Sequence, residues 1–140
     1  QPQMGDLGIR NGRIVAVGKV EGPFKRELKL DGLAIAPGFI DVHTHAENIE
    51  SHPDAKAFLR MGVTTLILGN CGSSRLNLDA YFKKLNQKGF SANVASLIGH
   101  GTVRRQVMTG SFMRPPSKKE LAEMGIEIQD TPEGTKWNRI

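Results

Sequence analysis

The sequence has 140 residues, of which 39% are hydrophobic and 24% charged, a composition that excludes a disordered or fibrous protein and indicates a globular one. Nineteen Lys and Arg residues against fourteen Asp and Glu residues give a formal net charge of +5, which permits acidic partners such as nucleic acid. The basic residues are scattered and no aromatic run lies among them, so nucleic-acid binding is disfavoured.

The single cysteine, Cys71, excludes an internal disulfide and suits a reducing compartment. No stretch approaches the roughly 20 apolar residues that a membrane-spanning helix needs. Residues 1–12 lack the basic start and apolar run of a secretory signal. We therefore expect a cytoplasmic protein with no membrane partner, and the sequence does not indicate its oligomeric state.

The first 36 residues show two pairs of short β-like segments, each joined by a dipeptide that favours a tight turn. These are residues 6–10 and 13–17 around Asn11-Gly12, and residues 27–30 and 33–36 around Asp31-Gly32. The pattern predicts a small antiparallel β unit over residues 1–36, which Pro37-Gly38 closes.

From residue 37 to residue 125, strand-like and helix-like segments alternate, which predicts an α/β domain with parallel strands and crossover helices. Beyond Gly125 no element is predicted, and residues 126–140 stay unassigned. The predicted strands are residues 39–44, 63–68 and 92–98, and the predicted helices are residues 53–61, 78–88 and 117–124.

Two of these helices carry end signals. Asn77 can accept a hydrogen bond from the first free N–H groups of the helix over 78–88, and Gly89 can end that helix. Ser117 with Glu120 has the spacing of a capping box, which predicts the start of the last helix.

The segment Asp41-Val42-His43-Thr44-His45 is the most informative for chemistry. In a strand, alternation places Asp41, His43 and His45 on one face at the carboxyl end. Two imidazoles in this position can converge on one metal ion if the strand end curls, and zinc accepts such ligands. The alternative is a pair of surface histidines, since a His-x-His pair alone is a weak signal.

Cys71 lies in Gly69-Asn70-Cys71-Gly72, directly after the second predicted buried strand. Strand alternation places a thiolate here at the same end of the sheet as His45. The flanking glycines favour an open backbone over a packed strand interior, and therefore a metal ligand. A buried, inert cysteine is the alternative.

Three further residues have weaker signals. His100 follows the third strand, where it can make a structural hydrogen bond or take a role near the metal or the substrate. Arg104 can pair with a substrate carboxylate, although a solvated arginine near a helix start explains it better. His52, before Pro53, is predicted to lie in the cap region of a helix rather than in a site.

Together these segments resemble the amidohydrolase superfamily, and within it the N-acyl-D-amino-acid deacylases, or D-aminoacylases. The segment Pro-Gly-Phe-Ile-Asp-x-His-x-His is similar to a motif of the superfamily. The segment Gly-Asn-Cys-Gly is similar to a motif of this branch, in which a cysteine is a zinc ligand in place of a carboxylated lysine. The matching segments are residues 5–18, Ala36 to His45, Gly62 to Thr65, Gly69 to Gly72, and Gly99-His100, within a match from about residue 5 to residue 124.

The resemblance implies the first part of a TIM-like (β/α)₈ barrel of a metal-dependent hydrolase, preceded by a small β-sandwich portion formed by residues 1–36. It implies that His43, His45 and Cys71 bind zinc, with Asp41 and His100 as candidates for contact with those ligands or with substrate. Asp41 could accept a hydrogen bond from a ligand imidazole, or make a purely structural one. The substrate class implied is a small N-acyl amino acid.

Part of that family's machinery is not identifiable in this sequence, including the catalytic aspartate and two further histidine ligands. Such a barrel takes roughly 250 residues, so the chain is expected to be a fragment or a joining of distant segments, inactive by itself. The stretch Thr131-Pro132-Glu133-Gly134 faintly resembles a piece near the carboxyl end of such enzymes. The alternatives are a catalytically inactive binding module that keeps the fold and, less favoured, a basic nucleic-acid-binding domain.

Overall fold

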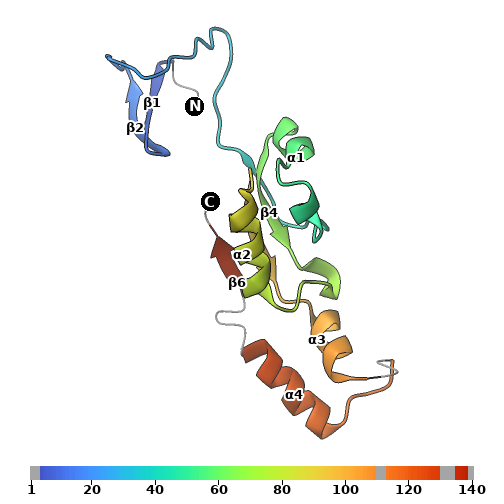
Figure 1. Cartoon of the computed structure of the whole chain (residues 1–140). Helices are drawn as coiled ribbons and strands as arrows, with labels where there is room; N and C mark the ends of the chain where they lie inside the picture. The colour runs from blue at the N-terminus through green and yellow to red at the C-terminus, as the bar shows by residue number, and fades with distance from the viewer. Residues whose placement is uncertain (1–3, 110–112, 130–134, 139–140) are drawn as a thin grey trace. The chain divides into compact units, whose positions relative to one another are not determined.

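The computed structural model describes residues 4–109, 113–129 and 135–138 of the chain. They divide into two compact units, residues 1–35 and 36–140, which we describe separately. Figure 1 shows the helices and strands of each unit. The Thr131 to Gly134 stretch lies outside the described residues.

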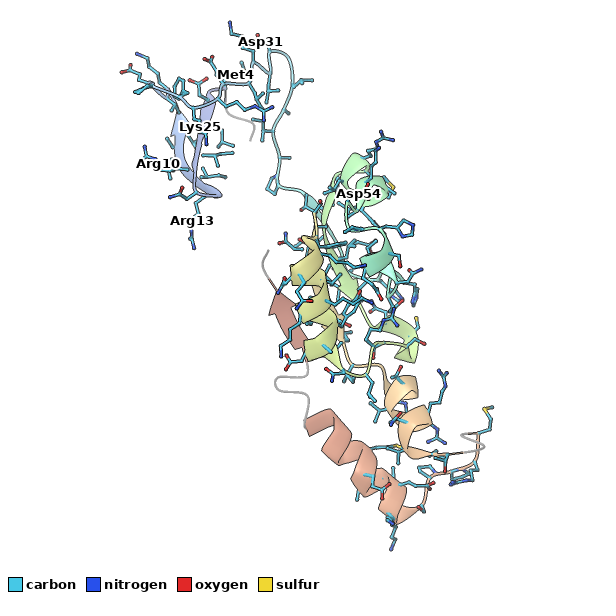
Figure 2. All side chains as sticks on the ribbon, viewed as in Figure 1. Met4, Arg10, Arg13, Lys25, Asp31 and Asp54 are labelled. Carbon is cyan, nitrogen blue, oxygen red and sulfur yellow. The ribbon has the colours of Figure 1, made fainter. Side chains whose placement is uncertain are left out.

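The first unit contains the hairpin predicted around Asn11-Gly12. Strand β1 (Asp6–Arg10) pairs antiparallel with β2 (Arg13–Gly18). Asn11 and Gly12 have φ angles of 51° and 69°, the left-handed conformation that a tight type I′ turn requires. The labelled side chains of Arg10 and Arg13 flank this turn at the tip of the hairpin (Figure 2).

The prediction of a second hairpin, over residues 27–36, is wrong. A turn forms at Asp31-Gly32, where Leu33 donates its backbone N–H to the carbonyl of Leu30 at 3.0 Å, but no strand flanks it. Leu28 and Leu33 are 62% and 71% exposed. Two strands without a further layer to cover them are marginal, so turn chemistry alone does not make a hairpin here.

The second unit contains a four-stranded sheet in the order β3-β4-β5-β6. Strands β3 (Phe39–Asp41), β4 (Val63–Leu68) and β5 (Asn93–Leu97) run parallel, as the α/β prediction required. Strand β6 (Thr135–Asn138) pairs antiparallel with β5 and was not predicted. It joins part of the unassigned segment 126–140 to the edge of the sheet.

Helix α2 (Leu78–Lys88) covers one face of the sheet and forms the main core (Figure 1). Its predicted bounds are confirmed, because Asn77 Oδ1 accepts from the Ala80 N–H at 2.9 Å and Gly89 ends the helix at φ 70°. Burying a Leu or Phe side chain contributes about 1.5–3 kcal/mol. The buried apolar residues of this core on α2 and the strands are Leu66, Leu68, Leu78, Tyr81, Phe82, Leu85 and Val94.

The other helices differ more from the prediction. The expected helix over 53–61 is only α1 (Lys56–Arg60), preceded by the 3₁₀ turn Ile49–Ser51. Helix α3 (His100–Val107) was not predicted. Helix α4 (Lys118–Gln129) begins at the expected capping box: Glu120 N–H donates to Ser117 Oγ at 3.3 Å and Ser117 N–H donates to Glu120 Oε2 at 2.7 Å.

Helices α3 and α4 pack on each other through a smaller apolar cluster that contains Val103, Met108 and Met124. Figure 1 shows these two helices side by side. Among the described residues, no helix combines the length and the apolar character needed to cross a lipid bilayer.

Candidate metal centre

The two histidines of the His-x-His pair lie in a loop rather than on a strand. Strand β3 ends at Asp41, so the expected strand over 39–44 is too long. Asp41 Oδ1 accepts the backbone N–H of His43 at 3.2 Å, which turns the chain as it leaves the strand. Thr44 then donates its N–H to the carbonyl of Ile67 at 3.1 Å, so the loop stays beside β4.

Cys71 lies in a tight loop after β4, in the 3₁₀ turn Asn70–Gly72. Gly69, Cys71 and Gly72 have φ angles of 79°, 54° and 83°. A side chain on a left-handed residue costs free energy, so the conformation of Cys71 is held by its surroundings. Asn70 contributes by donating its Nδ2 to the carbonyl of Ile67 at 2.8 Å.

The structure brings His43, His45 and Cys71 together. One ligand-type atom of each residue lies within 4.8 Å of those of the other two, and all three side chains are exposed. His43 Nε2 lies 3.1 Å from Cys71 Sγ, and the two imidazole rings meet edge to face with centroids 5.2 Å apart. Their convergence therefore comes from two loops and not from one strand face.

This donor set fits a metal ion, and zinc in particular. Zinc is bound by imidazole nitrogen and thiolate sulfur, and in tetrahedral geometry such atoms lie roughly 3.4–3.6 Å apart. The three ligand atoms lie within 4.8 Å of one another, with His43 Nε2 3.1 Å from Cys71 Sγ, so side-chain shifts of about an ångström would bring them to that spacing. A tetrahedral zinc ion takes four ligands, and this group supplies three of them within the part of the chain that the structure describes.

The other candidate residues lie outside the group of three. Asp41 contacts the backbone of His43, and no hydrogen bond from Asp41 to an imidazole is found among the described residues. His100 is exposed and opens α3. His52 is the C-cap of the 3₁₀ turn Ile49–Ser51 and does not lie at the helix start where it was expected, because α1 begins at Lys56 with Ala55 as its N-cap. The guanidinium of Arg104 donates to the carbonyl of Arg114.

Three residues beside this site were not singled out in the sequence: Glu47, Glu50 and Arg75. They connect the loop after β3 to the loop after β4. Charged residues in loops follow no periodic pattern, so the sequence does not mark Glu50 or Arg75. Glu47 lies two residues after His45, and that spacing is the one signal that could have identified it.

The chain has relatives among known proteins. No family model matches the chain. It is 34% identical to N-acyl-D-aspartate deacylase of Alcaligenes xylosoxydans xylosoxydans over 131 residues, which are 76% of this chain and 26% of that protein. It is also 31% identical to the D-aminoacylase of the same organism, over 85% of this chain and 30% of that protein. The chain is related to the N-acyl-D-amino-acid deacylases of the amidohydrolase superfamily.

Solved structures of these deacylases have the same fold over the matched part. A D-aminoacylase, studied for its binuclear metal centre, superposes with a TM-score of 0.82 at 30% identity, over 91% of this chain and 32% of that one. An N-acyl-D-glutamate deacylase from Bordetella bronchiseptica, complexed with zinc and a phosphonate inhibitor, superposes with a TM-score of 0.72 at 28% identity. The chain thus spans under a third of the length of these deacylases, as the fragment interpretation expects.

Proposed function

We propose that this chain supplies the first metal ligands of a zinc-dependent N-acyl-D-amino-acid deacylase, an enzyme that hydrolyses a linear amide bond. The observation that carries the proposal is the convergence of His43, His45 and Cys71 within 4.8 Å. Its support from outside the chain is the similarity to deacylases, one of them solved with zinc.

In this proposal each residue of the site has a defined role. His43 and His45 each offer a neutral nitrogen, and Cys71 binds as a thiolate whose charge offsets part of the charge of the cation. A zinc ion, when bound, would act as a Lewis acid that activates water and polarises the amide carbonyl. The residue that moves the proton is not identifiable in this chain.

The proposal extends to the complete architecture. The three parallel strands β3, β4 and β5 would be the first strands of a (β/α)₈ barrel, whose sites lie at the carboxyl ends of the strands. His43, His45 and Cys71 follow the carboxyl ends of β3 and β4. A lone cysteine used as a thiolate ligand suits a reducing compartment such as the cytoplasm.

The test has two parts. Zinc binding to the 140-residue chain is measured by competition with a chromophoric chelator, and one equivalent is expected. Hydrolysis of N-acetyl-D-amino acids, with the L-enantiomers as control, is measured on the complete enzyme of which this chain is proposed to be a part. Zinc binding without hydrolysis in the complete protein would instead favour the inactive binding module.

A further inference from the structure

The two loops that carry the metal-site residues are tied together at a second place, away from the ligand atoms. Arg75, four residues after Cys71, donates its Nε to the backbone carbonyl of Glu47 at 3.1 Å. Its Nη2 donates to Glu50 Oε1 at 2.9 Å. One guanidinium thus contacts two residues of the loop that follows His45.

Glu47 completes this connection in the opposite direction. Its Oε1 accepts the backbone N–H of Gly69 at 3.3 Å, just where β4 gives way to the loop of Cys71. Glu47 therefore contacts both ends of the segment 69–75, through its side chain at Gly69 and through its carbonyl at Arg75. Cys71 lies between these two contacts.

Burial and contacts with helix α2 restrict the movement of the Arg75–Glu50 ion pair. The side chain of Glu50 is only 10% exposed, whereas that of Arg75 is 45% exposed. Lys88 Nζ donates to the Glu50 carbonyl at 3.0 Å, so helix α2 fixes the backbone of Glu50. The Arg75 guanidinium also lies 5.7 Å from the centroid of the Tyr81 ring, a second contact with α2.

The other side of the same segment is held as well. Ser74 donates its N–H to Thr102 Oγ1 at 3.0 Å, and Gly99 donates its N–H to Ser74 Oγ at 2.8 Å. The loop of Cys71 is therefore fixed to the loop after β5 through Ser74. On the side that bears His43 and His45, the hydrogen bonds of Arg75 and Glu47 are the ones that fix it among the described residues, apart from the contact of Cys71 with His43 itself.

We propose that Arg75 is a positioning residue of the metal centre, holding the left-handed Cys71 loop against the His43–His45 loop at the separation a metal ion needs. The inference rests on the metal site of the proposed function. Arginine suits the role because its planar fork reaches a carbonyl and a carboxylate at once, which the single ammonium of lysine does not. Contacts that orient metal ligands typically change affinity 10- to 100-fold.

The test compares Arg75→Met with Arg60→Met in the 140-residue chain. Arg60 lies exposed in the last turn of α1, so its replacement removes the same charge elsewhere. Loss of a positive charge alone favours cation binding. A weaker zinc affinity in Arg75→Met therefore reports lost positioning and not lost charge.

We expect Arg75→Met to raise the zinc dissociation constant about tenfold or more, and Arg60→Met to leave it within about twofold. With Co²⁺ as probe, the thiolate charge-transfer band of Arg75→Met should weaken or shift, a signature that a merely structural role would not move. Arg75→Lys, which keeps one contact, should fall between wild type and Arg75→Met. Glu47→Ala, which frees Gly69, should weaken zinc binding more than Glu47→Gln, which loses the same charge but keeps an oxygen that can accept the N–H of Gly69.

Other results would overturn the inference. If Arg75→Met lowers the melting temperature but leaves the zinc affinity and the Co²⁺ spectrum unchanged, Arg75 only stabilises the fold. If Arg75→Met does not fold, unchanged zinc affinities of Arg75→Lys and Glu47→Ala have the same meaning. If wild type binds no zinc, the proposed function itself fails, whereas zinc binding that depends on Cys71 but not on Arg75 removes only this inference.

Discussion

His43 Nε2 lies 3.1 Å from Cys71 Sγ, although 28 residues separate the two in the sequence. At this distance the imidazole and the sulfur share a hydrogen bond. Two tetrahedral zinc ligands of these types lie roughly 3.5 Å apart. Metal binding must therefore displace the proton of this hydrogen bond and lengthen the distance between the nitrogen and the sulfur by about half an ångström. The pair is thus already close to the arrangement that a metal requires.

The first prediction concerns Cys71. Cys71→Ser should reduce bound zinc strongly, because a hydroxyl is a poor substitute for a thiolate. His52→Asn is the matched control, since His52 lies outside the group of three. Elemental analysis of the purified chains measures the difference, and equal zinc contents in the two variants would show that Cys71 is not a ligand.

The second prediction concerns Gly69, whose φ angle is 79°. A Cβ atom there would lie 2.1 Å from the backbone carbonyl oxygen of Leu97, which cannot move aside easily. Gly69→Ala should therefore lower the free energy of unfolding by about 2 kcal/mol or more, measured by urea denaturation.

Gly89 offers the matched control for that variant. Its φ angle is 70°, and a Cβ atom would meet nothing within 4 Å. Gly89→Ala should cost only the backbone strain, about 1 kcal/mol. Equal losses in the two variants would mean that the close approach to Leu97 relaxes.

The third prediction is that the 140-residue chain alone does not hydrolyse N-acetyl-D-amino acids at a measurable rate. On strand β3, Phe39 and Ile40 are 69% and 59% exposed, so apolar surface that a larger fold would cover is open. Initial rates with and without added zinc check this. Turnover that a chelator abolishes and zinc restores would contradict it.

The fourth prediction concerns the pH dependence of the α4 capping box. The side-chain hydrogen bond from Arg114, followed by those from Ser117, holds the pKa of Glu120 well below its ordinary value of 4.5. A depressed pKa in the folded state means that the stabilisation is complete above 4.5 and is lost as the pH falls below it. Glu120→Gln should therefore lower the melting temperature at pH 7, with a difference that shrinks from about pH 5 toward pH 2.

Glu123→Gln on the same helix is the control. Glu123 forms an ion pair with Lys119 at 3.8 Å, and the Lys119 side chain is 87% exposed. Such a surface pair contributes little, so this variant should melt close to wild type at pH 7. A pH-independent effect of Glu120→Gln would show that its carboxylate charge plays no part in the cap.

The sequence predicts best those elements whose signals are local. The turn at Asn11-Gly12 and helix α2, with Asn77 and Gly89 at its ends, form as expected because backbone conformation and capping decide them. Strand β4 has the predicted bounds because its β-branched apolar run packs within the sheet. The hairpin over 27–36 fails because its stability depends on a covering layer that local chemistry does not reveal.

The sequence predicted that His43, His45 and Cys71 lie close together, as they do, but it predicted the wrong backbone geometry for the two histidines. The expectation that His43 and His45 share a strand face assumed a strand to Thr44, whereas β3 ends at Asp41. Helix α3 was missed because glycines flank its first residue and Val103 is its one buried residue. The links from Arg75 to Glu47 and Glu50 join positions 25–28 residues apart, and no local pattern marks such contacts.

The close backbone contacts of the Cys71 loop bear on how its length can change in evolution. Gly69 lies against Leu97, Gly99 against Gly72, and Arg75 against Glu47, so the segment is fixed at short intervals on both flanks. An inserted or deleted residue between Gly69 and Arg75 would shift at least one of these contacts out of reach. Homologous chains should therefore keep this segment at seven residues and vary in length only after Arg75, before helix α2.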